Sequence, residues 1–228
     1  MTSTSIMARA IGRILLKSLP AVAILFVPVS AQAQIAGERA GSSTEYYIEG
    51  QEVWNTVATF GRCYASMNRT AAISLVATRP GSIEEAKVYR QLFSKPYQSC
   101  LGNVTRMNVA HTMVRGAIAE GLYQKKIPAP PGLAVSTVPS RDQVKNLSDA
   151  ALCYANAHRS IAQALVDNTR PGSKREFDAV QALAPGLLNC IPASRTKRVE
   201  LEATLIRFRL AEAMWRLGLT PSGTVGKN

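Results

Sequence analysis

Two stretches of this chain contain the same series of short matches in the same order. When Cys63 is aligned with Cys153, the first stretch reads "CYASMNRTAAISLVA" and the second reads "CYANAHRSIAQALVDN", and both continue with "TRPGS", at 78–82 and at 169–173. Further on, "VRGAIAEGLYQ" at 114–124 aligns with "IRFRLAEAMWR" at 206–216, and the register drifts by only two residues over the whole span. Composition alone does not explain ordered matches of this kind, so the sequence predicts an internal duplication of about 90 residues.

Each copy is predicted to fold into three helices, which makes the chain all-α, because no stretch shows the alternating pattern of a strand. We expect a break in the first helix near Gly50 or Gly61. In the second copy, Ser140 and Gln143 match a capping box at the start of that helix. The middle helix of each copy contains a proline that should kink or shorten it. The expected ranges are 45–78, 83–99 and 105–125 in the first copy and 141–168, 174–189 and 195–217 in the second.

The repeated TRPGS motif is predicted to end one helix, turn the chain and begin the next helix. The residue before a proline is pushed out of the helical region, and Gly81 allows a backbone bend that a β-carbon would resist. Ser82 can then cap the following helix, with Glu85 three residues further on. The second copy repeats this pattern, so helix capping explains the motif except for its arginine, Arg79 or Arg170.

The first 33 residues are predicted to be a cleaved secretory signal peptide. They combine a basic start with the apolar run "SLPAVAILFVPVS" and the small-residue pattern "AQA", which places cleavage near Ala33. The apolar run is too short to span a bilayer readily, so we expect no transmembrane span in the mature chain and a periplasmic or extracellular location. The other predicted segments are a first helical repeat at 34–125, a proline-rich linker at 126–139, a second helical repeat at 140–217 and a disordered tail at 218–228.

The four cysteines are expected to form disulfides, because an exported chain with an even number of cysteines usually pairs them. Cys63 lies 16 residues before Arg79, and Cys100 lies 18 residues after Ser82. At about 1.5 Å per residue, the two cysteines lie level with each other in an antiparallel helical hairpin. The same reasoning pairs Cys153 with Cys190, so each repeat is predicted to contain its own disulfide.

No cofactor or metal ion is expected from the sequence. Zinc ligands usually occur as close pairs such as C-x-x-C, and the chain has none. Its two histidines, His111 and His158, align with other residue types in the opposite copy, so a site common to both copies cannot use histidine. The sequence also lacks a glycine-rich phosphate loop and an H-E-x-x-H motif.

The formal net charge of +12 favours an anionic partner, although it also suits a solvated surface. We expect this partner to be another protein or an anionic component of the cell envelope. Nucleic acid is not expected, because the chain is predicted to be exported and has no basic run with interleaved aromatic residues. The sequence does not indicate an oligomeric state.

Polar residues that both copies share are the candidates for a functional site. With a raised pKa, Glu120 or Glu212 could act as a general acid, as lytic cell-wall enzymes require. An ion pair between each glutamate and a shared arginine on a neighbouring helix is the favoured interpretation, because buried carboxylates are usually paired. The shared polar pairs are Arg69 and Arg159, Arg79 and Arg170, Arg115 and Arg207, Glu120 and Glu212, and Tyr64 and Tyr154.

Three functional hypotheses follow from these patterns. The favoured one is an exported, non-enzymatic binding or interaction protein that uses the surface between its two repeats. The first alternative is a cell-envelope hydrolase in which Glu120 or Glu212 is the general acid. The second alternative is a basic protein that associates with the envelope surface through its charge.

Overall fold

The computed structural model describes residues 44–93, 100, 109–133, 137–193 and 202–221. Within these residues the chain forms eight α-helices and one short 3-10 helix, and no strand, so the all-α prediction is confirmed. The predicted signal peptide lies outside the described residues. The α-helices are α1 (Thr44–Met67), α2 (Arg69–Ala77), α3 (Ile83–Phe93), α5 (His111–Gln124), α6 (Leu147–Ala157), α7 (Arg159–Asn168), α8 (Lys174–Asn189) and α9 (Ala203–Arg216).

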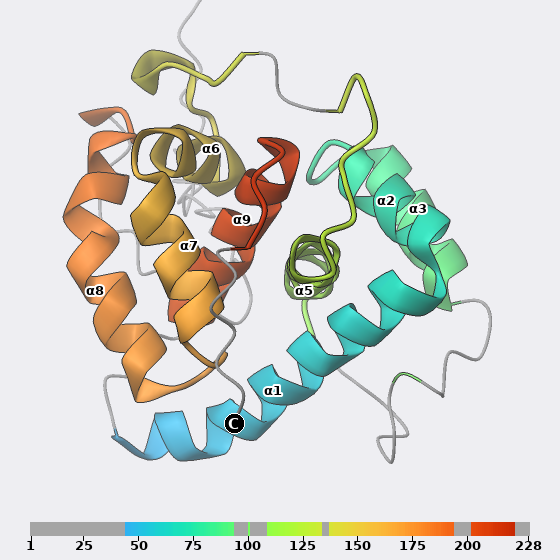
Figure 1. The fold of residues 1–228 in the computed structure, drawn as a ribbon, viewed down its shortest axis with the longest axis horizontal. Coiled ribbons are helices and arrows are strands. Elements are labelled where there is room, and N and C mark those ends of the chain that lie inside the picture. Colours follow the sequence, from blue (N-terminus) through green and yellow to red (C-terminus); the bar gives the residue numbers. More distant parts are fainter. Residues whose placement is uncertain (1–43, 94–99, 101–108, 134–136, 194–201, 222–228) are drawn as a thin grey trace, which may run out of the picture. The chain divides into compact units, whose positions relative to one another are not determined.

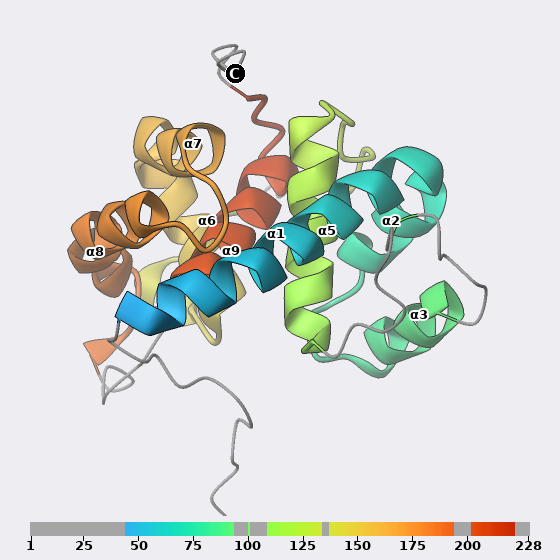
Figure 2. The same cartoon turned by 90° about the horizontal axis from the view of Figure 1, so that it is seen from below.

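Helices α5 and α9 pack against each other and form the middle of the fold (Figure 1). Helix α2 packs on α5, and α6, α7 and α8 pack on α9. Helix α1 packs across α5, and its first turns extend towards α8, as the view from below also shows (Figure 2). We refer to the described residues between 44 and 133 as the N-terminal half, to those between 137 and 221 as the C-terminal half, and to the region where they meet as the seam.

The two halves share one hydrophobic core. Its central part combines Val114, Ile118 and Leu122 of α5 with Leu210 and Met214 of α9, and all five side chains are fully buried. These positions recur every three or four residues, which is the spacing that places side chains on one face of a helix. The sequence did not indicate whether the halves pack together, and the structure places both in one core.

The first predicted helix of each copy is two helices in the structure. The break comes at Asn68, between α1 and α2, and at His158, between α6 and α7. Asn68 has φ −129° and ψ 52°, and His158 has φ −129° and ψ 49°, so both residues leave the helical region in the same way. The predicted break near Gly50 or Gly61 is therefore wrong, because α1 continues through both glycines.

The first helix of the C-terminal half begins later than the sequence predicts. Ser140 and Gln143 do form a capping box, but it opens only the 3-10 helix Arg141–Gln143. Helix α6 begins at Leu147, after a new N-cap at Asn146, whose side chain accepts the backbone N–H of Asp149 at 3.0 Å. Ser140 therefore caps the 3-10 helix, and Asn146, which lies closer to the apolar run, is the N-cap of α6.

The second and third predicted helices are present in both halves. Helix α8 covers the predicted range 174–189 and continues through Pro185, so this proline does not shorten it. Helix α3 ends its described part at Phe93, and Pro96 lies outside the described residues. Helices α5 and α9 begin at His111 and Ala203, later than the predicted starts, whose residues 105–108 and 195–201 are not described.

The segments outside the helices pack against them. The described part of the proline-rich segment 126–139 contains turns and no helix. In the segment predicted as a disordered tail, the carbonyl of Thr220 accepts a hydrogen bond from Gln163 at 2.7 Å, and Pro221 is buried. Residues 218–221 therefore belong to the packed C-terminal half, and 222–228 lie outside the described residues.

The disulfides join Cys63 to Cys100 and Cys153 to Cys190, as the helical-hairpin argument predicts. Each bond links residues 37 positions apart, and each stays within one half. Such bonds are typical of proteins that fold in an oxidising compartment. Among the helices that the structure describes, none has both the length and the apolar character needed to cross a bilayer.

Helices α1 and α5 approach each other closely at two glycines. A β-carbon built on Gly61 would overlap the backbone carbonyl group of Ala117, and one built on Gly121 would lie 2.6 Å from the carbonyl oxygen of Gly61. Glycine at these positions lets the two backbones touch. Gly61, which the sequence suggested as a helix breaker, is instead a packing residue inside α1.

Replacing Gly61 with alanine should therefore destabilise the fold. Alanine favours the helix by up to about 1 kcal/mol, but overpacking against a backbone carbonyl usually costs about 1–3 kcal/mol. We expect the packing effect to dominate, because the backbone of α5 cannot rotate away as a side chain can. Urea unfolding should show a net loss for Gly61→Ala. Val53→Ala, at a 48%-exposed position on the same helix, should stay within about 0.5 kcal/mol of wild type.

Candidate functional site

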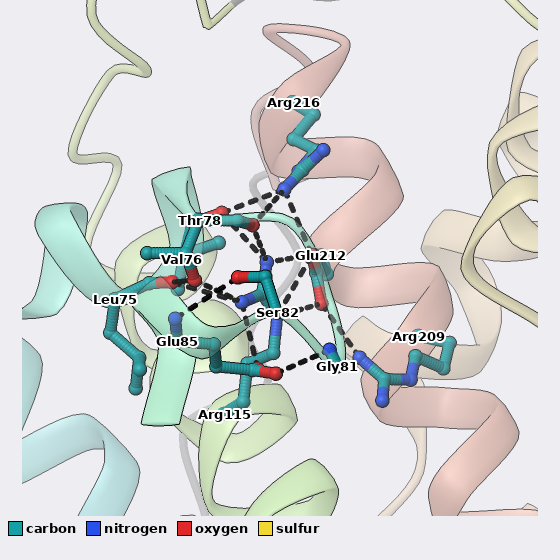
Figure 3. A network of polar contacts seen from close by, with 10 residues as sticks. All are labelled: Leu75, Val76, Thr78, Gly81, Ser82, Glu85, Arg115, Arg209, Glu212 and Arg216. Carbon is teal, nitrogen blue, oxygen red and sulfur yellow. Dashed lines mark hydrogen bonds and ion pairs between the residues drawn. The ribbon is translucent and has the colours of Figure 1, made fainter. Parts of the chain in front are cut away.

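The first buried polar network is centred on Arg115 of α5, whose side chain is fully buried (Figure 3). Its Nε and Nη2 donate to the carboxylate of Glu212 on α9, at 3.1 and 2.8 Å. Its Nη1 donates to Oε1 of Glu85 on α3 at 3.0 Å. A fully buried guanidinium is stable only when its charge and its donors are satisfied, and these two carboxylates supply the charge.

The same guanidinium also caps the C-terminal end of α2. It donates to the carbonyl oxygens of Leu75, Val76 and Thr78, at 2.9, 2.8 and 2.9 Å. The last carbonyls of a helix have no partner within the helix, and they carry partial negative charge that favours a cation. Arg115 therefore holds the end of α2 against α5 and α9.

The TRPGS motif forms the turn next to this guanidinium, as predicted. Helix α2 ends at Ala77, Gly81 has φ +75°, and the hydroxyl of Ser82 accepts the backbone N–H of Glu85 at 3.1 Å. Glu85 reaches back and accepts the backbone N–H of Gly81 at 2.6 Å. One carboxylate thus closes the turn and binds Arg115, which gives the motif a structural function.

The second network is centred on Arg207 of α9, whose side chain is 1% exposed. Its Nε and Nη2 donate to the carboxylate of Glu120 on α5, at 2.8 and 3.0 Å. It also donates to the carbonyl oxygens at the end of α7 and in the second TRPGS motif, those of Leu165, Val166 and Thr169, at 3.2, 2.7 and 3.1 Å.

The two networks connect the halves reciprocally. Arg115 of the N-terminal half binds Glu212 of the C-terminal half, and Arg207 of the C-terminal half binds Glu120 of the N-terminal half. The ion-pair interpretation of Glu120 and Glu212 is therefore confirmed. Each of these two ion pairs joins a glutamate to the arginine on the third helix of the other half, so both pairs connect the halves.

The two networks differ in how many arginines they contain. In the first, Glu212 also accepts a hydrogen bond from Arg209 at 3.0 Å and lies 3.4 Å from Arg216. In the sequence alignment Arg209 faces Ala117 and Arg216 faces Gln124. The second network therefore has an amide at the position where the first has a guanidinium, and Gln124 donates to Glu120 at 2.8 Å.

The three arginines around Glu212 affect its pKa. Burial alone would raise the pKa of Glu212, but the guanidinium of Arg115, with Arg209 and Arg216, lowers it below its ordinary value. Such a carboxylate stays ionised, which is the opposite of what a general acid requires. The general-acid alternative is therefore not supported at Glu212.

Glu176, the counterpart of Glu85, lies in the second network and was expected only as a capping residue. Burial raises the pKa of Glu176 to about 7, against the lowering effects of Arg207, Thr204 and Gly172. Its Oε2 accepts hydrogen bonds from the Thr204 hydroxyl at 2.8 Å and from the backbone N–H of Gly172 at 2.7 Å. Its Oε1 lies 3.8 Å from Nε of Arg207 and accepts no hydrogen bond from the described residues.

Glu176→Gln should remove a pH dependence from the stability of the fold. Between pH 4.5 and about 7 the unfolded chain releases this proton while the folded chain keeps it, so rising pH destabilises the wild type. At about 1.4 kcal/mol per pKa unit, the loss is about 3 kcal/mol. Urea unfolding at pH 5 and pH 8 should show a smaller loss for Glu176→Gln than for wild type, by about that amount.

The matched control for this prediction is Glu85→Gln in the first network. Glu85 is ion-paired to Arg115 at 3.0 Å. Its neutral variant should therefore be less stable than wild type at both pH values, because it removes a charge-assisted hydrogen bond from a buried guanidinium. An equal pH dependence in wild type and Glu176→Gln would contradict the assignment of the titrating group.

A polar pocket of about 600 Å³ lies at the seam beside the second network. It is lined by residues of both halves, from α1, from the C-terminal end of α5 and from the second TRPGS motif. Arg207 of the second network and the prolines Pro171 and Pro221 are among the residues that line it. The residues that line it are Asn55, Thr59, Arg62, Gln124, Lys125, Val166, Asp167, Thr169, Arg170, Pro171, Arg207 and Pro221.

The other shared residues lie outside the two networks. The side chains of Arg69, Arg79, Arg159 and Arg170 are exposed, and among them only Arg170 lines the seam pocket. Tyr64 and Tyr154 are buried in the core; Tyr154 packs against the ring of His158, with the centroids 4.7 Å apart. No group of three potential metal ligands occurs in the described part of the chain.

Sequence reasoning missed Glu85, Glu176 and the threonines of the TRPGS motif as members of the networks. The sequence does contain a pattern that points to the two glutamates, because each lies three residues after the serine that ends its TRPGS motif. It was assigned to helix capping, and each glutamate does take part in capping.

Comparison with known proteins adds no functional information: no family model, curated protein or solved structure matches this chain.

Proposed function

We propose that this chain is an exported, non-enzymatic binding protein, built from a duplicated helical unit, whose partner binds at the seam pocket. The observation that carries the proposal is the pocket itself, which residues of both halves line. Its volume of about 600 Å³ lies within the range of ordinary ligand sites. The two disulfides favour a periplasmic or extracellular location.

The duplication is supported by features that the sequence alignment did not use. The helix breaks at Asn68 and at His158 fall at aligned positions and have nearly the same backbone angles. Arg115 and Arg207 are also aligned. Arg115 binds the end of α2 and Arg207 binds the end of α7, and each arginine binds a glutamate of the opposite half. We infer an ancestral unit of about 90 residues that paired with a second copy of itself.

The hydrolase alternative has less support than the binding hypothesis. Glu120 and Glu212 are at most 2% exposed, each is held by an arginine, and neither lines the seam pocket. A general acid must come within hydrogen-bond distance of its substrate, and neither carboxylate has such access. Arg207 of the second network instead forms part of the pocket wall.

Association through the basic surface is the second candidate, and the exposed arginines favour it. One experiment separates the two candidates: capture from an envelope fraction with wild type, Arg170→Glu and Arg79→Glu, followed by mass spectrometry. Both substitutions reverse one exposed charge in the same motif, but only Arg170 lines the seam pocket.

Under the pocket proposal, Arg170→Glu should lose a partner that Arg79→Glu retains. If both variants lose it equally, and if high salt abolishes the association, the basic surface is the binding element. A partner that all three proteins capture equally at any salt concentration would contradict both candidates.

A further inference from the structure

The seam pocket is lined by the counterparts of Arg216 and of the two residues whose carbonyls bind Arg216 in the first network. In the first network, Arg216 donates to the carbonyl oxygens of Val76 and Thr78, at 2.7 and 3.3 Å. The sequence alignment matches Arg216 with Gln124, Val76 with Val166 and Thr78 with Thr169. All three matched residues of the second network line the pocket.

The two carbonyls in the second network can accept a further donor. Arg207 donates one hydrogen bond to the carbonyl of Val166 and one to that of Thr169. A carbonyl oxygen has two lone pairs, and in the first network Val76 and Thr78 each accept from both Arg115 and Arg216. The carbonyls of Val166 and Thr169 are thus the counterparts of the two carbonyls that bind a guanidinium in the first network.

The second network, which lies beside the pocket, also contains fewer arginines than the first network. The first network sets three arginines against two glutamates, whereas the second sets Arg207 alone against Glu120 and Glu176. Asp167 adds a further carboxylate to the pocket wall. Burial is the main cause of the raised pKa of Glu176, and Arg207 is the cation that acts to lower it.

The remaining cations lie among the other lining residues of the pocket. Arg62 of α1 is half-buried, and Lys125 and Arg170 are exposed. They come from three different segments and meet at one pocket, where they favour an anionic group. A ligand that satisfies both parts of the pocket must therefore carry a cation and an anion.

We propose that the seam pocket binds a small zwitterion, with its guanidinium beside Gln124 and its carboxylate among Arg62, Lys125 and Arg170. This inference rests on the proposed function and specifies its ligand class. A planar guanidinium matches paired carbonyl acceptors better than an ammonium does. The pocket volume of about 600 Å³ is large enough for an amino-acid-sized molecule.

Isothermal titration with three probes tests the ligand class. L-arginine carries the guanidinium and the carboxylate, agmatine lacks the carboxylate, and L-citrulline lacks the guanidinium charge. All three probes carry an ammonium group, so this charge does not differ among them. We expect saturable binding of L-arginine, with agmatine weaker by about tenfold or more and no detectable binding of L-citrulline. Equal binding of L-arginine and L-citrulline, or no binding of L-arginine, would overturn the proposal.

The variant Gln124→Arg tests the location. Its new guanidinium should occupy the place that Arg216 occupies in the first network, so this variant should abolish L-arginine binding and raise the melting temperature. Arg170→Glu provides a second test at an exposed position, where folding is not at risk, and it should weaken L-arginine binding by about tenfold or more. Unchanged binding in Gln124→Arg, or in Arg170→Glu if the first variant does not fold, would overturn the assignment.

The ligand class and the proposed function can fail separately. If L-arginine does not bind but Arg170→Glu still loses a partner that Arg79→Glu retains, the ligand assignment is wrong and the pocket remains the binding site. If L-arginine binds and no partner depends on Arg170, the pocket is a small-molecule site and the protein-partner version of the function is wrong.

Discussion

Replacing Arg115 with methionine is expected to lower the free energy of unfolding by about 3–5 kcal/mol, because it leaves the carboxylate of Glu85 without its ion-pair partner and removes one of the arginines that bind Glu212. Arg115 is fully buried and provides the ion-pair partner of Glu85 and one of the partners of Glu212. Methionine fills much of the same volume. The decrease in unfolding free energy therefore comes mainly from the lost charge and hydrogen bonds, and less from a cavity. Urea unfolding followed by circular dichroism measures it.

The size of this effect follows from the number of groups that depend on one side chain. Besides the two carboxylates, the carbonyls of Leu75, Val76 and Thr78 lose a donor. Lysine should not rescue the loss, because a single ammonium cannot reach two carboxylates and the end of α2 in the fork geometry of a guanidinium. We expect Arg115→Lys to be nearly as unstable as Arg115→Met.

The matched control is Arg69→Met, at an exposed arginine that the copies also share. Surface substitutions of this kind usually change stability by less than about 0.5 kcal/mol. If Arg115→Met and Arg69→Met have similar small effects, the buried network does not stabilise the fold.

Removing the Cys153–Cys190 disulfide by a double alanine substitution is expected to cost about 4 kcal/mol in the chain-entropy model. The bond closes a loop with a sequence separation of 37 residues, and the first disulfide has the same separation. Removing Cys63–Cys100 instead should therefore cost a similar amount. The comparison is informative because the two bonds lie in different halves.

Because both halves share one core, each loss should appear as a single cooperative transition at lower denaturant concentration. Two separate transitions in either double variant, with only one of them shifted, would show that the halves unfold independently. That result would contradict the shared core.

The sequence predicted the elements that depend on local spacing. The disulfide pairing followed from the helical rise, since the cysteines lie at nearly equal distances from the TRPGS turn. The turn itself was predictable because capping is local chemistry. The breaks at Asn68 and His158 were not, because neither residue type excludes a helix and packing against the core decides where the axis changes.

The site was harder to predict for a different reason. Aligning two copies compares equivalent residues, Arg115 with Arg207 and Glu120 with Glu212, and does not show which half each side chain lies against. The alignment also directs attention to the residues that match. The candidate pocket depends on a residue that does not match, Gln124 where the other copy has Arg216.

A double-mutant cycle across the seam tests the reciprocal pairing most directly. The cycle measures the unfolding free energies of wild type, Arg207→Met, Glu120→Leu and the double variant. If each half neutralises the buried charge of the other, the two substitutions should be coupled by about 2–3 kcal/mol, with the double variant more stable than the sum of the single losses predicts. Additive losses, with a coupling energy near zero, would contradict the pairing of Arg207 with Glu120.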